Sequence, residues 1–185
     1  MLLKDKVAFI TGAASGLGRA TAENFIAAGA NVMIFDLNEE NAEKAASELG
    51  DNATFAAGDV ANADAVSAAI DKTLSQYGAL HININSAGIG AASRTLGRDG
   101  PMDLKMFEFV IRVNLVGTFN CLRLCANAMQ SNEPVTEDGE RGVIVNVASV
   151  AAFDGQIGQA AYSASKAGVA GMTLPIARDL SRSGI

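Results

Sequence analysis

The sequence is poor in cysteine, in proline and in long apolar runs. Its only two cysteines, Cys121 and Cys125, lie four residues apart in a helical pattern, which favours buried helix positions over a disulfide framework. Three prolines and 49% apolar residues exclude a disordered or collagen-like chain. No unbroken apolar run reaches the roughly 18 residues of a membrane span, and the short, charged segment 1–6 is unlike a signal peptide.

Basic residues are also in short supply. Lys and Arg together number 14 against 20 Asp and Glu, which gives a formal net charge of −6. An acidic chain without a Lys/Arg cluster does not suit nucleic acid or an anionic membrane, so we expect a small-molecule partner. The cysteine usage predicts a reducing compartment and a cytoplasmic protein. A processed protein of the mitochondrial matrix would have the same composition.

What the chain does have is a regular alternation of strand-like and helix-like segments. Its 185 residues predict one domain, residues 1–185, that is large enough to bury a core. The alternation predicts right-handed βαβ crossovers and an α/β fold, namely a Rossmann-type, doubly wound parallel sheet with helices on both faces. The predicted strands cover residues 7–10, 31–35, 54–57, 80–85 and 142–147, and the predicted helices 16–28, 38–49, 62–77, 103–130 and 161–181.

The segments that interrupt or end this alternation carry expectations of their own. Residues 92–102 and 131–141 are expected to be long polar loops. Gly184 and Ile185 resemble the first step of a sixth strand, so a sheet of order 3-2-1-4-5-6 would lack its outer strand. We therefore expect a chain without the C-terminal strands of its fold, in which the fifth strand is an unpaired edge.

A glycine-rich turn follows the first predicted strand. Gly12 permits the tight turn, Gly16 lets the backbone approach a pyrophosphate, and Gly18 lets the next helix pack closely. The N-terminus of that helix offers free N–H groups and partial positive charge to phosphates. Together with Ser15 and Leu17, these residues are predicted to bind a dinucleotide, the alternative being a plain glycine turn.

Asp36 ends the second predicted strand, 18 residues after Gly18. At this position a carboxylate accepts hydrogen bonds from the ribose hydroxyls of an adenosine. A 2′-phosphate would meet the negative charge of Asp36, and no Arg or Lys stands at 13–15 or 37–38 to offset it. The sequence therefore predicts NAD as the cofactor rather than NADP.

The third and fourth predicted strands end at the same edge of the sheet, where small residues would let the cofactor pass. For the acidic residue of this set, Asp59, the alternative role is a cap of the following helix, and both roles can hold together. For the residues after the fourth strand, the alternative is an ordinary turn. The predicted cofactor-binding residues here are Asp59, Val60, Asn85, Ser86, Ala87 and Gly88.

A set of polar residues in the second half of the chain predicts acid–base chemistry. Tyr162 and Lys166 are four residues apart and share a helix face, so the lysine ammonium favours the phenolate form of the tyrosine. Ser149 follows the fifth strand and precedes Tyr162 by 13 residues, where its hydroxyl can hold a substrate oxygen. Asn114, among apolar helix residues, needs a partner if it is buried. It either anchors a water that links Lys166 to solvent or makes a structural hydrogen bond in a bent helix.

Together, these motifs resemble the short-chain dehydrogenase/reductase family from residue 4 to the end of the chain. The resemblance implies Tyr162 as general acid/base, Ser149 as the substrate-orienting residue, Lys166 as an anchor for the cofactor ribose, and Asn114 as part of a proton relay. Tyr162 and Lys166 would thus contact the cofactor as well. It also implies a homotetramer at full length. His81 stands where many members carry Asp, and we expect it to be structural.

Residues 147–162 and the two polar loops resemble the type II 3-hydroxyacyl-CoA dehydrogenase branch of this family. That resemblance implies Gln156 as a substrate-binding residue beside Ser149. It also implies a role in fatty acid metabolism, with hydride transfer between NAD and a secondary alcohol, most specifically a 3-hydroxyacyl-CoA. Two alternatives stay open: a hydroxysteroid or other secondary-alcohol dehydrogenase, and a non-catalytic NAD-binding fragment. No metal site is expected.

Overall fold

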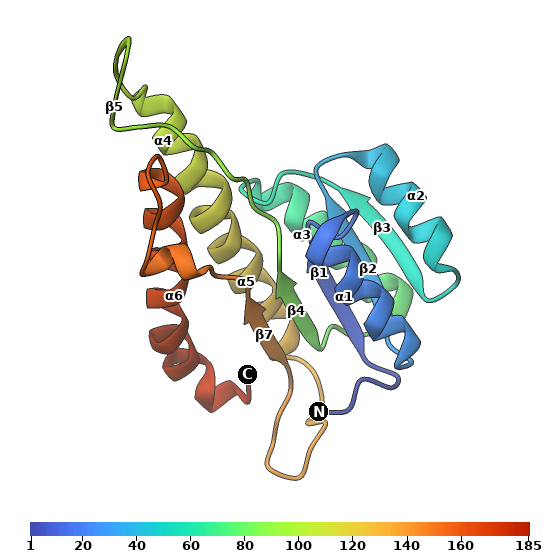
Figure 1. Ribbon diagram of the computed structural model, residues 1–185. Helices are drawn as coiled ribbons and strands as arrows, with labels where there is room; N and C mark the ends of the chain where they lie inside the picture. Colours follow the sequence, from blue (N-terminus) through green and yellow to red (C-terminus); the bar gives the residue numbers. More distant parts are fainter.

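A five-stranded parallel sheet forms the centre of the computed structural model, which describes residues 1–185 (Figure 1). Because the order is β3-β2-β1-β4-β7, the predicted Rossmann-type, doubly wound sheet is confirmed, with β7 as its edge strand. All five residues of β1 are buried, as is usual for a strand covered on both faces. The strands are β1 Val7–Thr11, β2 Asn31–Asp36, β3 Ala53–Ala57, β4 Ile82–Asn85 and β7 Val143–Asn146.

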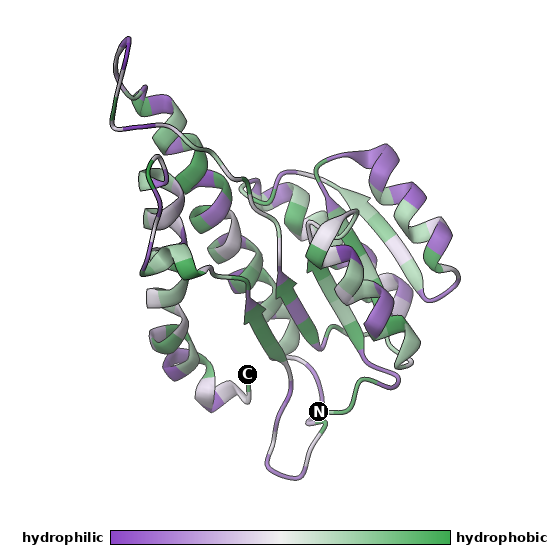
Figure 2. Cartoon of the chain, viewed as in Figure 1, coloured by the Kyte–Doolittle hydropathy of each residue, from purple (hydrophilic) through white to green (hydrophobic).

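Helices cover both faces of the sheet (Figure 1). On one face, α1 (Gly16–Ala27) and α2 (Glu39–Leu49) bury alanines against the isoleucines and valines of the strands. On the other face, α3 (Ala63–Tyr77) and the helix that carries Cys121 and Cys125 pack against Phe9, Met33 and Phe35. Both cysteines are fully buried, as predicted. Figure 2 shows the apolar strands between helices whose outer sides are polar.

The helix predicted over residues 103–130 is not a single α-helix. It consists of α4 (Leu104–Ile111), a π-helical segment (Arg112–Val116) and α5 (Gly117–Met129). A π-turn fits one extra residue into a helix and is frequent at functional sites. The run Leu104–Met129 is long and apolar enough to cross a membrane by length and composition, with a window of mean hydropathy 1.3, half of it buried in the fold. The core helix of a folded domain passes the same test.

The two segments expected to be loops differ from each other. Residues 131–141 form a loop, as predicted, whereas residues 92–102 contain a small antiparallel hairpin of β5 (Leu96–Gly97) and β6 (Gly100–Pro101) that projects from the molecule (Figure 1). Strands of two residues are too short to leave a periodic pattern in a sequence. The last long helix, α6 (Ala160–Leu180), follows a 3-10 turn at Val150–Ala152.

Hydrogen bonds from side chains tie together the amino-terminal ends of the strands. His81 Nδ1 accepts from the Val7 amide at 3.2 Å, which is a structural role, as expected for this residue. Asn132 Nδ2 donates to the carbonyl oxygens of Leu80, at 2.6 Å, and Arg141, at 2.9 Å. These bonds hold the beginnings of β1, β4 and β7 in place.

Candidate active site

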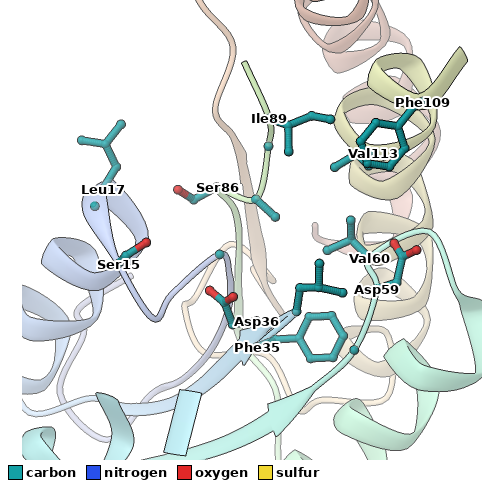
Figure 3. A pocket seen from close by; sticks show the side chains of 16 residues that line it. Ser15, Leu17, Phe35, Asp36, Asp59, Val60, Ser86, Ile89, Phe109 and Val113 are labelled. Atoms are coloured by element: carbon teal, nitrogen blue, oxygen red, sulfur yellow. The ribbon is translucent and has the colours of Figure 1, made fainter. Parts of the chain in front are cut away.

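Two adjoining cavities open at the carboxyl ends of the strands, where ligands bind in sheets of this kind. The first has a volume of about 450 Å³ and includes the glycine-rich turn and the ends of β2, β3 and β4 (Figure 3). The second, of about 660 Å³, includes the segment after β7 and the start of α6. The two cavities share four lining residues: Leu17, Ser86, Gly88 and Ile89.

The glycine-rich turn forms one wall of the first cavity. Gly16 has a φ of +55°, and a Cβ added there would meet no atom within 4 Å, so the space in front of it is open to a ligand. A Cβ on Gly18 would lie 2.3 Å from the Gly12 carbonyl oxygen, so Gly18 permits close packing and does not line the cavity. Gly12, Ser15 and Leu17 do line it. The structure thus brings the predicted turn residues together.

Thr11 supports this wall from behind and is not among the site residues predicted from the sequence. Its buried Oγ1 accepts from the amides of Ser86, at 3.1 Å, and Ala87, at 3.0 Å. These bonds join the end of β1 to the segment after β4. A threonine directly before the glycine turn is the signal that could have revealed it.

Asp36 lies on the wall of the first cavity and faces the glycine-rich turn (Figure 3). Its Oδ2 accepts from the Ala14 amide at 3.1 Å. Of the cavity-lining residues only Asp36 and Asp59 have titratable side chains, so the lining contains no basic group. This arrangement suits ribose hydroxyls and opposes an extra phosphate at the same place.

Asp59 and Val60 also line the first cavity, but Asp59 is not a helix cap. Asn62 caps α3 instead, since its side chain accepts from two backbone amides of the first turn. The alternative role of Asp59 is therefore wrong. Its Oδ1 accepts from the Ala61 amide at 2.8 Å, and its Oδ2 pairs with Arg112.

The four residues at the end of β4 divide into two roles. Ser86, Ala87 and Gly88 line the first cavity, and their role in cofactor binding stays a prediction. Asn85 does not line it: this residue is buried, and its Nδ2 donates to the side chains of Asn83, at 2.7 Å, and Asn146, at 2.9 Å. Asn85 therefore joins β4 to β7 inside the fold.

Ser149, Tyr162 and Lys166 line the second cavity together. Ser149 Oγ accepts from the Ala151 amide at 3.1 Å, which leaves its O–H free to donate. Lys166 Nζ lies 5.8 Å from the centre of the Tyr162 ring and donates to the Val147 carbonyl oxygen at 2.8 Å. Burial lowers the pKa of Lys166. A hydroxyl donor, a phenol and an ammonium thus converge on one space beside the first cavity.

Asn114 lies behind this space, fully buried in the π-helical segment. Its Oδ1 accepts from the Ile89 amide at 2.8 Å, and its Nδ2 donates to the Ile89 carbonyl, at 3.0 Å, and to Ser165 Oγ, at 3.1 Å. Ser165 in turn donates to the Tyr162 carbonyl at 2.7 Å. Asn114 therefore makes structural hydrogen bonds, as one of its two predicted roles requires. Its part in a proton relay stays a prediction.

Gln156, the residue expected to bind substrate beside Ser149, lies outside the second cavity. Its side chain is exposed, and the glutamine that lines the cavity is Gln159, which the sequence analysis did not select. Gln159 Oε1 accepts from the Gln156 amide at 2.9 Å, so its Nε2 is free to act as a donor. The role implied for Gln156 stays a prediction.

Comparisons with known proteins agree with this geometry. A sequence model of the short chain dehydrogenase family matches residues 6–185. The chain is 52% identical to the 3-hydroxyacyl-CoA dehydrogenase type-2 of Drosophila melanogaster, over 100% of this chain and 72% of that protein. It is 50% identical to the Homo sapiens protein of the same name, over 99% of this chain and 70% of that one.

A solved structure also matches. The crystal structure of 3-hydroxyacyl-CoA dehydrogenase type-2 from Mycobacterium avium aligns with a TM-score of 0.93 at 43% identity, covering 99% of this chain and 72% of that one. These proteins confirm the resemblance found in the motifs. The chain belongs to the short-chain dehydrogenase family and is an oxidoreductase that acts on CH–OH donors with a nicotinamide cofactor.

Proposed function

We propose that this chain catalyses hydride transfer between NAD and the 3-hydroxyl carbon of a 3-hydroxyacyl-CoA. The observation that carries the proposal is the junction of the two cavities. Four lining residues are common to the space beside Asp36 and the space beside Ser149, Tyr162 and Lys166. A dinucleotide in the first cavity would thus end where a substrate alcohol is held. The names of the Drosophila melanogaster and Homo sapiens relatives support the choice of alcohol.

The first cavity suits a dinucleotide with free ribose hydroxyls. The open space in front of Gly16 would admit the pyrophosphate at the N-terminus of α1. Asp36 would accept hydrogen bonds from the ribose, and its charge would oppose a 2′-phosphate, which favours NAD over NADP. When bound, the nicotinamide would accept the hydride.

The residues of the second cavity would move the proton. Ser149 would hold the substrate oxygen by donating its free O–H, and Tyr162 would take the hydroxyl proton as general base. Lys166 uses one N–H on the Val147 carbonyl and has two left for the cofactor ribose and the phenolate. Positioned proton transfer of this kind contributes about 10²–10⁴-fold to a rate.

The test is near-ultraviolet absorbance of the purified chain with NAD and 3-hydroxybutyryl-CoA, against NADP and against a no-substrate control. We expect NADH to accumulate with NAD and much more slowly with NADP. Faster turnover of a hydroxysteroid or of a simple secondary alcohol would contradict the substrate class. NAD binding with no turnover of any alcohol would indicate a cofactor-binding fragment and would contradict the proposal. A homotetramer and a cytoplasmic or mitochondrial location stay predictions.

A further inference from the structure

Arg112 forms an ion pair with Asp59, a residue of the first cavity, across the gap between two elements. Arg112 begins the π-helical segment, whereas Asp59 lies in the loop between β3 and α3. In Figure 3, Asp59 lies beside Val60, below the helix that carries Phe109 and Val113. Arg112 itself does not line the cavity, whereas its partner Asp59 does.

The pair fixes the Asp59 carboxylate at both oxygens. Oδ1 accepts from the Ala61 amide at 2.8 Å, and Oδ2 is held by the Arg112 guanidinium. Each carboxylate oxygen has a second lone pair, so a fixed Asp59 is still an acceptor for a ligand in the cavity. Without Arg112, Oδ2 would lose the only side-chain donor that the structure gives it.

The loop that carries Asp59 has other anchors. Asn120 Nδ2 donates to the Val60 carbonyl at 2.8 Å, and a Cβ on Gly117 would lie 2.4 Å from Val60 Cγ2. Val60 therefore packs tightly against α5 whether or not Arg112 is present. What Arg112 adds is the orientation and neutralisation of the carboxylate, since the rest of the loop is already held.

The place of Asp59 in the cavity indicates which part of a dinucleotide it would meet. The end of the cavity near Ser86 and Gly88 joins the catalytic space, so the reacting end of the cofactor would lie there. The purine base, at the opposite end of the dinucleotide, would then lie near Asp59. The apolar side chains of Val60, Phe109 and Val113 would surround it. An acceptor-only carboxylate at that place favours a base with an exocyclic amino donor over a base with an oxo oxygen at the same position, because that oxygen would face the carboxylate.

We propose that Arg112 is a positioning residue for base selectivity: it holds the Asp59 carboxylate as an acceptor for an exocyclic amino group, which an adenine has and a 6-oxo purine lacks. The inference rests on the proposed NAD-binding function and adds to it a residue outside the cavity. Arg112 also offsets the charge of one of two carboxylates that would otherwise both repel the pyrophosphate.

Isothermal titration calorimetry tests this without any turnover. NAD and nicotinamide hypoxanthine dinucleotide, its 6-oxo analogue, are titrated into wild type, Arg112→Ala, Arg112→Lys and the matched control Arg98→Ala, which removes a positive charge from the tip of the β5–β6 hairpin. We expect wild type to prefer NAD by about tenfold, as a lost charged hydrogen bond would give. Arg112→Ala should weaken NAD binding about fivefold and the analogue less, so that the preference shrinks. Arg112→Lys should fall between the two.

The outcomes separate this inference from the proposed function. If wild type binds neither dinucleotide, the cofactor proposal itself is wrong. If wild type binds NAD but Arg112→Ala keeps the full preference for NAD over the analogue, Arg112 does not set base selectivity. The same conclusion follows if Arg112→Ala changes the dissociation constants of both dinucleotides only as much as Arg98→Ala does. A double variant sharpens the result, because in an Asp59→Asn background the Arg112→Ala change should alter the NAD dissociation constant by less than about twofold. A larger change there would overturn the proposal.

Discussion

The two ends of the same five strands are built in opposite ways. At the amino-terminal ends, side chains use up the backbone groups they meet: Asn132 binds two carbonyl oxygens, and His81 takes the Val7 amide. At the carboxyl ends, polar side chains that line the second cavity keep a donor free, as Ser149 does with its O–H and Gln159 does with its Nε2. The side chains at the amino-terminal ends of the strands are therefore structural, whereas those at the carboxyl ends, the carboxyl edge of the sheet, are available to ligands. Substitutions should separate stability from catalysis accordingly.

Among the substitutions that compare the two ends of the strands, the largest effect is expected at Ser149. Ser149→Ala should lower kcat by about 10²–10⁴-fold, because the substrate oxygen loses its positioned donor. Its melting temperature should stay close to that of the wild type, since the side chain makes only one hydrogen bond to the backbone. Ser131→Ala, in the loop at the opposite edge, is the matched control and should keep full turnover. Equal activity of the two variants would contradict the division between the edges.

The counterpart at the structural edge is Asn132→Ala. Removal of the Asn132 side-chain amide leaves the carbonyl oxygens of Leu80 and Arg141 without their donor, so the free energy of unfolding should fall by about 1–3 kcal/mol. Denaturant unfolding measures this, with exposed Asn127→Ala as the control. The kcat of the folded fraction should not change. A specific loss of kcat without a loss of stability would show that the loop 131–141 takes part in catalysis.

A smaller effect distinguishes the two glutamines near the second cavity. Gln159→Glu keeps the acceptor for the Gln156 amide but puts a negative charge where Nε2 can donate, so the KM for 3-hydroxybutyryl-CoA should rise about fivefold. Gln156→Glu, on an exposed side chain, should change it by less than about twofold. The reverse order would mean that substrate binding draws the segment 150–159 inward and that Gln156 has the role implied by the family.

The smallest effect is the pH dependence that His81 gives to stability. Burial, and after it the charge of Lys6, lowers the pKa of His81 below its ordinary value of 6.5. The unfolded chain then binds a proton more readily, so stability should fall as the pH drops from 6.5 through the lowered folded-state pKa. Protonation also removes the acceptor for the Val7 amide. Melting temperatures of wild type and His81→Asn should converge in this range; a constant difference would contradict the assignment.

The sequence predicted the sheet, its order and most of the site because these depend on local patterns. The glycine spacing lies within one turn, Asp36 is the last residue of one strand, and the Tyr162–Lys166 pair lies on one helix face. The features that sequence reasoning missed depend on neighbours distant along the chain. The Asp59–Arg112 pair joins residues 53 positions apart, and Thr11 Oγ1 meets amides 75 and 76 positions away. No periodicity reports such contacts.

Local sequence patterns also gave wrong predictions where two different structures are compatible with the same pattern. The π-helical segment keeps the apolar character of a continuous helix, so nothing in the residue types marks the extra residue that aims Arg112, Val113 and Asn114 at different targets. Likewise, Asp59 and Asn62 are both residue types that cap helices well and both precede α3, and in the structure Asn62 is the cap.

The most direct test of the whole account is Tyr162→Phe, which removes one hydroxyl from the cavity wall. Turnover of 3-hydroxybutyryl-CoA with NAD is followed by absorbance, and NAD binding to the same preparation by calorimetry. The account predicts that turnover falls to background while the dissociation constant for NAD stays within about twofold of the wild type, because the glycine-rich turn and Asp36 line the first cavity and are not altered by a change at Tyr162 in the second. Retained turnover in this variant would contradict the assignment of the carboxyl edge as the site of acid–base catalysis.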